Sequence, residues 1–180
     1  GTGIAAGIII DGKILEGAGG AAGEFGHVVV NKEGYKCGCG LTGCLETYCS
    51  ATGIVREGRR RLELDKNNAL YEVIGGDLEK LEAKHIFDLA KKGDKFSSEI
   101  VDFFCEKLAE GVGMLLNIIN PEIIIFTGGV ARAGEIITDG VKKYLPKYAL
   151  GMTMENLIFT FGKLEEEAGI KGAAALVMNK

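Results

Sequence analysis

Residues 120–129 read Asn-Pro-Glu-Ile-Ile-Ile-Phe-Thr-Gly-Gly, and this stretch decides the fold class. Pro121 ends the segment before it, because proline cannot continue a helix. The apolar run 123–126 lies between turn signals and predicts a parallel strand that is covered on both faces. The paired glycines then end this strand in a tight turn.

The segments on either side of this strand carry a helical pattern. Upstream, Ser97 or Ser98 can cap a long helix whose apolar residues recur at helical spacing. The expected buried stripe of this helix is Ile100, Phe104, Leu108, Val112, Leu115 and Ile119. Downstream, residues 133–145 predict a helix, 157–161 a strand and 170–177 a final helix. Strands that alternate with helices predict an α/β fold.

The N-terminal part of the chain adds shorter elements. Residues 3–10 predict a buried strand, and Asp11-Gly12 predicts a two-residue hairpin turn into residues 13–15. The remaining expectations are a short strand at 28–30, one or two helices at 45–64, and a loop or short helices at 66–83. No linker or internal repeat divides the sequence, so we expect residues 1–180 to form a single unit.

The charge balance excludes some classes of partner. The 180 residues carry 21 Lys plus Arg against 25 Asp plus Glu, a formal net charge of -4. A chain this mildly acidic has no overall field that would gather nucleic acid or an anionic membrane. No apolar stretch reaches the roughly 18 residues of a membrane helix, and the given sequence does not open on a basic segment followed by an apolar one. We expect a cytoplasmic protein without a membrane partner, and the abrupt start at Gly1 leads us to expect more chain upstream.

A local concentration of arginine raises the question of nucleic acid again. The arginines concerned are Arg56, Arg59, Arg60 and Arg61. Acidic residues at positions 57, 63 and 65 lie among them and dilute their charge. A solvated helix face is therefore the better prediction than a nucleic-acid patch.

The strongest chemical signal is a cysteine-rich run. Residues 37–44 read Cys-Gly-Cys-Gly-Leu-Thr-Gly-Cys, and His27 lies ten residues before Cys37. His27, Cys37, Cys39 and Cys44 would complete a tetrahedral Cys₃His zinc site, closed to water and therefore structural. The alternatives are a reduced cysteine cluster or disulfides, and disulfides are rare in the cytoplasm. The other two cysteines lie on expected helices and are predicted core residues, Cys49 and Cys105.

Two carboxylates bracket this run. Glu24 lies three residues before His27, and Glu46 lies two residues after Cys44. Carboxylates accept strong hydrogen bonds from hydroxyl groups, so a pinned loop with two acids and an imidazole suits a ligand with vicinal hydroxyls. The alternatives are that both acids are surface groups or that they support the metal ligands.

Two glycine-rich turns form a third signal. Gly1-Thr2-Gly3 precedes an expected strand, and Thr127-Gly128-Gly129 follows a strand and precedes an expected helix. Free backbone N–H groups in such turns can hold phosphate, although glycine also marks ordinary sharp turns. Neither turn has the Gly-Lys-Ser/Thr of a P-loop.

Together these features closely resemble the ROK family of sugar kinases, repressors and related proteins. The resemblance covers nearly the whole chain, and its most specific part is the cysteine run with the Glu and His upstream. The family-like stretches are the Gly-Thr-Gly strand at 1–10, Gly-Glu-Phe-Gly-His at 23–27, Cys-x-Cys-Gly-x-x-Gly-Cys-x-Glu at 37–46, Asn-Pro-Glu to Thr-Gly-Gly at 120–129, and Ala-Gly-Ile-Lys-Gly-Ala-Ala at 168–174.

This resemblance implies an actin-like ATPase, ribonuclease H-like α/β lobe with a zinc-binding loop. Residues 1–180 would be the larger, C-terminal lobe of a two-lobed sugar kinase. Glu24, His27 and Glu46 would bind the sugar, and His27 would also bind the structural zinc. ATP, accompanied by Mg²⁺, would contact the glycine turns at Gly1, Thr2, Gly3, Gly7, Gly128 and Gly129.

The resemblance also implies what this chain lacks. The family's catalytic base is an Asp in an Asn-Asp pair of the first lobe, and no Asn-Asp occurs here. We therefore expect no catalytic residue in this chain, and we expect its own N-terminal lobe as a partner. The implied activity is ATP-dependent phosphorylation of a hexose, foremost glucose to glucose 6-phosphate, by a homodimer or tetramer. The alternatives are a sugar-sensing ROK transcriptional repressor with a DNA-binding domain upstream, and a zinc-stapled interaction module.

Overall fold

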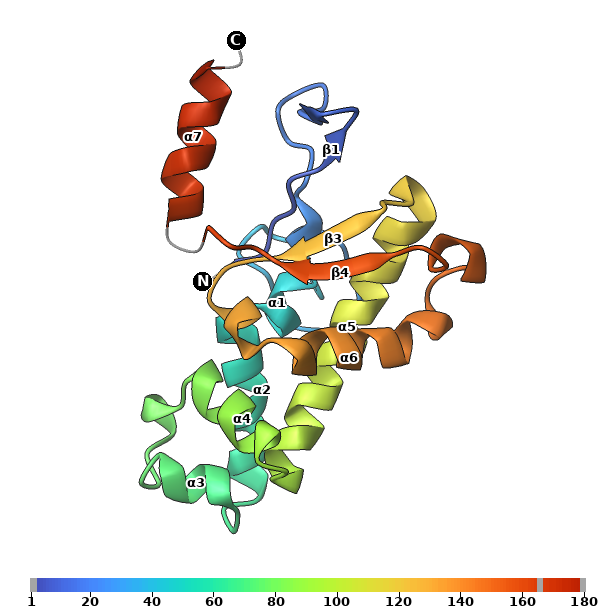
Figure 1. The fold of residues 1–180 in the computed structure, drawn as a ribbon. Helices are drawn as coiled ribbons and strands as arrows, with labels where there is room; N and C mark the ends of the chain where they lie inside the picture. Colours follow the sequence, from blue (N-terminus) through green and yellow to red (C-terminus); the bar gives the residue numbers. More distant parts are fainter. Residues whose placement is uncertain (1–2, 165–166, 179–180) are drawn as a thin grey trace.

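The computed structural model describes residues 3–164 and 167–178. Figure 1 shows the strands at one end of the molecule and three helices, α2 to α4, at the other, with α5 running between the two ends. The helices are α1 (Glu46–Cys49), α2 (Ala51–Leu64), α3 (Ala69–Val73), α4 (Ala83–Lys91), α5 (Lys95–Ile119), α6 (Glu135–Tyr144) and α7 (Ala168–Met178). The strands are β1 (Ile9–Ile10), β2 (Lys13–Ile14), β3 (Ile123–Phe126) and β4 (Ile158–Phe161).

The α/β prediction is confirmed by the pair β3 and β4. These strands are parallel, in a register that opposes Ile123 to Ile158 and Phe126 to Phe161, and α6 lies in the connection between them. The prediction that β3 is covered on both faces is wrong: Ile123 is 43% exposed and Ile125 is 59% exposed. Successive side chains of a strand point to opposite faces, and the helices of this chain cover only one face of the pair.

The opening segment differs from its prediction. Only Ile9–Ile10 forms a strand, and it pairs antiparallel with Lys13–Ile14 around the expected Asp11-Gly12 turn. The Ile9 side chain is 71% exposed, so this strand is not buried. All four residues of β1 and β2 are exposed, so no described element covers either face of this hairpin.

The predicted strand at 28–30 is also replaced by irregular structure. A single turn of 3₁₀-helix spans Phe25–His27, and an isolated bridge then joins Val29 to Cys44. The predictions for 45–64 and 66–83 are confirmed by the pair α1 and α2 and by short helices. Helix α4 was not anticipated.

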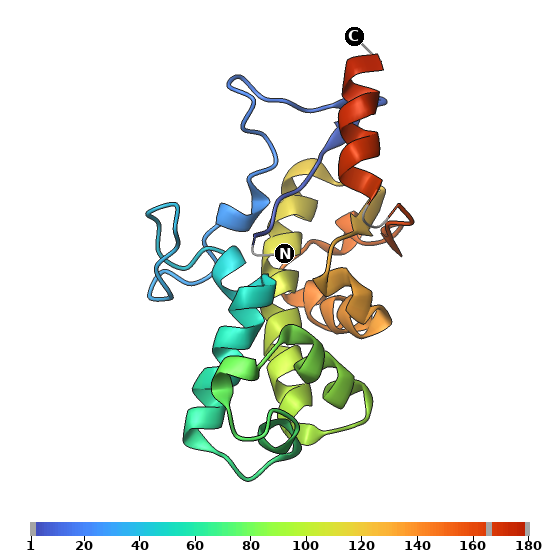
Figure 2. The same ribbon diagram turned by 90° about the vertical axis from the view of Figure 1, so that its left-hand side faces the viewer.

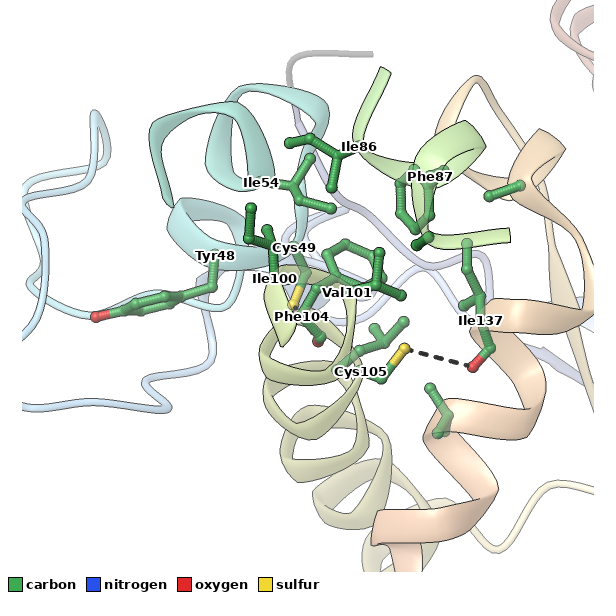
Figure 3. Packing of buried hydrophobic residues seen from close by; sticks show 14 of the residues in the cluster. Tyr48, Cys49, Ile54, Ile86, Phe87, Ile100, Val101, Phe104, Cys105 and Ile137 are labelled. Atoms are coloured by element: carbon green, nitrogen blue, oxygen red, sulfur yellow. Dashed lines mark hydrogen bonds between the residues drawn. The ribbon is translucent and has the colours of Figure 1, made fainter. Parts of the chain in front are cut away.

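The core is built around α5. This helix packs against α1, α2, α4 and α6, and Figure 3 shows the resulting cluster, in which Phe104 lies between residues of three other helices. The predicted stripe is confirmed at its first four positions, but Leu116 is buried in place of Leu115 and Ile119. Cys49 and Cys105 are 4% and 1% exposed, as predicted for core residues. Burial raises the pKa of the Cys105 thiol to about 12, so this sulfur is an inert thiol in the core.

None of the helices in the described ranges is long and apolar enough to cross a membrane.

The N-terminus of α5 is capped by Asp94, and neither Ser97 nor Ser98 is the cap. An Asp94 carboxylate oxygen accepts the Ser97 N–H at 2.8 Å, and the Ser98 hydroxyl donates to the Asp94 carbonyl at 2.6 Å. The Ser97 hydroxyl is buried and has no hydrogen-bond partner among the described residues.

We therefore predict opposite effects for two substitutions at this end of α5. Asp94→Ala removes the cap and should lower the free energy of unfolding by about 1 kcal/mol. Ser97→Ala removes an unpaired buried hydroxyl and should be neutral or stabilising. Urea denaturation of both variants measures the difference. A loss at Ser97→Ala as large as that at Asp94→Ala would show that the serine hydroxyl does the capping.

Candidate functional site

The cysteine run folds into a tight loop, residues 35–44, that is tied to the segment after His27. The Val30 N–H donates to the Gly43 carbonyl at 2.9 Å, and the Leu45 N–H donates to the Val28 carbonyl at 2.8 Å. Within the loop, the Cys37 N–H donates to the Leu41 carbonyl at 2.9 Å. These backbone bonds bring His27 beside cysteines that follow it by ten or more residues.

The four predicted metal ligands converge. One ligand atom from each of His27, Cys37, Cys39 and Cys44 lies within 4.8 Å of all the others. Cys37 Sγ is 3.7 Å from His27 Nδ1, and Cys39 Sγ is 3.6 Å from Cys44 Sγ. A disulfide would need about 2.05 Å, and these cysteines are free thiols. Around a tetrahedral zinc ion with ligand distances of about 2.0–2.3 Å, neighbouring ligand atoms lie about 3.5–3.8 Å apart, so the cluster has the size and the donor set of a Cys₃His site.

Burial divides the three sulfurs. Cys44 is fully buried and Cys37 nearly so, whereas Cys39 is exposed. Burial raises the pKa of the Cys44 thiol to about 12, whereas a hydrogen bond from the Leu41 backbone lowers the pKa of Cys39. A buried thiol of this kind becomes a thiolate ligand only when a cation stabilises the negative charge.

The two nitrogens of the His27 ring face different groups. Nδ1 faces Cys37 within the cluster, and Nε2 is 3.6 Å from a carboxylate oxygen of Glu24. Glu24 is exposed, with 63% of its side chain accessible. A carboxylate on the outer nitrogen orients the ring of a metal-binding histidine, so one of the alternatives predicted for Glu24, support of a metal ligand, fits this geometry.

Glu46 lies between the cysteine cluster and the opening segment. It is the first residue of α1, its Oε2 accepts the Ile4 N–H at 3.0 Å, and its Oε1 is 3.9 Å from Cys37 Sγ. A side chain added at Gly3 would come within 2.8 Å of Glu46 Oε2. The structure therefore brings Gly3, from a turn predicted to bind phosphate, next to Glu46, a residue predicted to bind sugar. Sequence reasoning missed Ile4, because a backbone donor leaves no signal in residue type.

The small residues of 23–27 allow two stretches of backbone to touch. The Ala6 N–H donates to the Gly23 carbonyl at 2.8 Å, and a Cβ at Gly26 would lie 2.2 Å from the Ile4 carbonyl oxygen. This contact holds the opening segment against the turn that carries Glu24 and His27.

The second glycine turn follows β3 and is separate from this cluster. Gly128 has φ +86°, which favours glycine, and Gly129 has ordinary helical backbone angles. A Cβ at Gly128, Gly129 or Gly7 would meet no other atom within 4 Å, so the backbone is open to a ligand at all three. A 3₁₀ turn, Val130–Ala133, follows Gly129, and α6 then confirms the helix predicted over 133–145. The predictions for Gly1 and Thr2 lie outside the described residues.

The family model described as "ROK family" matches residues 1–180. The chain belongs to the ROK family. It is 38% identical to a glucokinase of Thermotoga maritima over 100% of this chain and 56% of that protein. It is also 32% identical to the DNA-binding transcriptional dual regulator NagC of Escherichia coli, over 97% of this chain and 41% of the regulator. The chain thus spans about half the length of these relatives.

The solved structures most useful for comparison include both functional branches of the family. A ROK family glucokinase from Streptomyces griseus, in complex with glucose and AMPPNP, matches with a TM-score of 0.87 and 33% identity, over 98% of this chain and 57% of that one. A ROK family transcriptional regulator, a homologue of the Escherichia coli MLC protein, matches with a TM-score of 0.83 and 26% identity, over 96% of this chain and 42% of that one. The fold is the actin-like α/β fold of ROK sugar kinases, as predicted.

The contact at Gly26 generates a prediction with a matched control. Gly26→Ala should lower the free energy of unfolding by about 1–3 kcal/mol, because the new methyl group overlaps the Ile4 carbonyl. Gly38→Ala should change it by less than about 0.5 kcal/mol, because a Cβ there meets no atom within 4 Å. Thermal denaturation of both variants measures the effects, and equal midpoints would mean that the opening segment does not press on Gly26.

Proposed function

We propose that this chain is the larger lobe of an ATP-dependent hexose kinase whose foremost substrate is glucose, phosphorylated to glucose 6-phosphate. The observation that carries the proposal is that Glu24 and His27, from the 3₁₀ turn, and Glu46, from the start of α1, all lie beside the Cys₃His cluster. The similarity to a glucokinase that binds glucose and AMPPNP supports the same activity.

In this proposal the chain orients the sugar. The carboxylates of Glu24 and Glu46 accept hydrogen bonds from vicinal hydroxyls, and His27 Nε2 faces the same side as Glu24. Phosphoryl transfer depends chiefly on positioning and on stabilisation of charge, so a fixed sugar hydroxyl is the main contribution of this lobe. The Asp that accepts the hydroxyl proton belongs, by family resemblance, to the N-terminal lobe, which we propose as the partner of this chain.

The nucleotide would lie against the glycine turns. Gly128 and Gly129 offer open backbone at the end of β3, Gly7 offers open backbone in the opening segment, and Gly3 lies next to Glu46. Mg²⁺ would accompany ATP, because the divalent ion neutralises charge on the phosphates during transfer.

We also propose a structural zinc ion on His27, Cys37, Cys39 and Cys44. When bound, zinc supplies four fixed bonds that tie the cysteine loop to the His27 turn. Glu46 follows the last ligand by two residues, so the metal would fix its backbone without using its carboxylate as a ligand. By family resemblance we propose a homodimer or tetramer.

A sugar-responsive repressor is the second candidate. NagC and a xylose repressor of Caldicellulosiruptor bescii, 28% identical over 99% of this chain, are relatives of this branch. The same three residues would then bind an effector sugar without phosphoryl transfer. A full-length protein that binds sugar and operator DNA but does not consume ATP would favour this candidate.

The first prediction of this proposal concerns zinc content. The full-length protein, purified without chelator, should hold one zinc ion per chain by elemental analysis. Cys37→Ser should lose the metal, because a hydroxyl is a poor zinc ligand. Cys49→Ser is the matched control, since Cys49 is buried in the core and donates to the Phe104 carbonyl. Zinc-free parent protein, or equal zinc in both variants, would contradict the assignment.

The second prediction separates the sugar from the metal. The parent should phosphorylate glucose with ATP, and Glu46→Gln should weaken glucose binding by about 10- to 150-fold, because a hydrogen bond to a charged group contributes about 1.5–3 kcal/mol. Glutamine keeps an oxygen for the Ile4 N–H, so zinc content, thermal stability and ATP affinity should be unchanged. His27→Ala should lose zinc and sugar together. Glucose titration and elemental analysis of the same samples test both variants, and parental glucose affinity in Glu46→Gln would exclude Glu46 from the sugar site.

A further inference from the structure

A concave site lies along α2, away from the strands and from the Cys₃His cluster. It has a volume of about 760 Å³, within the range of small-molecule sites, and its walls come from α2, from Tyr35 of the cysteine loop and from Leu81–Ala83 before α4. Figure 2 shows α2 descending below the cysteine loop toward α3 and α4, far along the molecule from β3 and β4. The residues proposed to bind sugar, Glu24, His27 and Glu46, do not line it, and neither do the glycine turns.

Three of the four arginines that the sequence placed on a solvated face line this site. Arg56 and Arg60 are exposed, as that prediction has it, and each of the three arginines also makes contacts with protein groups. The Arg56 guanidinium stacks over the Tyr35 ring at 4.9 Å and donates to the Thr47 carbonyl at 3.1 Å. Arg59 pairs with the Glu79 carboxylate at 3.2 Å, and Arg60 donates to both carboxylate oxygens of Glu57.

Glu57 is the carboxylate that balances the charge of Arg60. It is 5% exposed and also accepts from Arg61 at 2.7 Å. Burial alone would raise the pKa of Glu57, but the hydrogen bonds from Arg60 and Arg61 outweigh it and hold the pKa below its usual value. This carboxylate therefore stays charged and neutralises Arg60 on the rim of the site.

Two arginines have donors left for a ligand. Arg56 is exposed and forms no ion pair with a carboxylate among the described residues, while stacking and one hydrogen bond fix its orientation. The Nε of Arg59 is buried and has no hydrogen-bond partner in the described part of the chain. A buried donor without a partner costs stability, so a water molecule or a ligand that supplied an acceptor there would be stabilised.

The rest of the lining limits what such a ligand can be. Ala51, Val55 and Leu81 form an apolar wall, which can pack against a small organic body. Glu63 and Glu82 also line the site and would repel a ligand that is negative along its whole length. The combination suits a molecule with one compact anionic end and a neutral body.

We propose that this site binds a small organic phosphate, with the phosphate between Arg56 and Arg59 and the neutral body against Val55 and Leu81. The planar guanidinium groups match the oxygens of a phosphate, and stacking on Tyr35 holds Arg56 ready for it. The site is separate from the proposed sugar and nucleotide sites, so its occupancy does not depend on kinase activity.

Calorimetric titration of the full-length protein with ribose 5-phosphate tests this proposal. Glucose and AMPPNP are present at saturation, so that the proposed sugar and nucleotide sites are already filled. We expect binding of ribose 5-phosphate, and at least tenfold weaker binding of ribose, inorganic phosphate and gluconate. The Arg56→Gln/Arg59→Gln double variant should weaken binding of ribose 5-phosphate at least tenfold. The matched control Lys91→Gln/Lys92→Gln removes two exposed positive charges from the end of α4, outside the site, and should bind like the parent.

Four outcomes would overturn the proposal. The first is no binding of ribose 5-phosphate to the parent, and the second is equal binding by parent and arginine variant. The third is an equal loss in the lysine control, which would reduce the effect to net charge. The fourth is binding of gluconate as tight as that of ribose 5-phosphate, which would exclude a phosphate-specific site. Thermal denaturation of the arginine variant checks that it is folded, and the single variant Arg56→Gln, which leaves Arg59 and its contacts intact, replaces it if it is not.

Discussion

Two backbone hydrogen bonds, from Val30 to Gly43 and from Leu45 to Val28, hold the candidate site together. They join the turn that carries His27 to the loop that carries the cysteines, and every other contact of the site depends on that junction. The fully buried Leu45 anchors the junction in the core beneath it. The site is therefore supported on one side by packed helices and on the other by the opening segment, which Glu46 holds through the Ile4 N–H.

The helices serve the site by making its support rigid. Helix α5 crosses the molecule and packs against α1. Helix α1 follows the cysteine loop and begins at Glu46. A side chain at Gly111 of α5 would come within 2.7 Å of Leu45, which shows how closely the two elements approach. Burial of this kind fixes backbone positions to within the tolerance that the proposed hydrogen bonds to a sugar require.

The sequence predicted the parts of this molecule that are governed by local chemistry. The Cys₃His grouping followed from residue type and spacing, and β3, β4 and α5 followed from periodicity. The misses came from information that lies outside any single segment. Asp94 and Ser97 are both good capping residues, and only the path of the chain into α5 decides between them. The exposure of Ile125 depends on which helices cover the sheet, and the contact of Ile4 with Glu46 is made by a backbone atom that every residue but proline possesses.

The unequal burial of the three clustered sulfurs has a kinetic consequence for any ion held there. Cys37 and Cys44 are shielded by protein, so among the three sulfurs an incoming ligand would reach the ion at Cys39. Exchange would then begin by replacement of that one sulfur, while the other three donors keep the ion in place. The lifetime of the bound metal would depend on the concentration of competing ligands in solution, and the affinity of the cluster alone would not determine how long an ion stays.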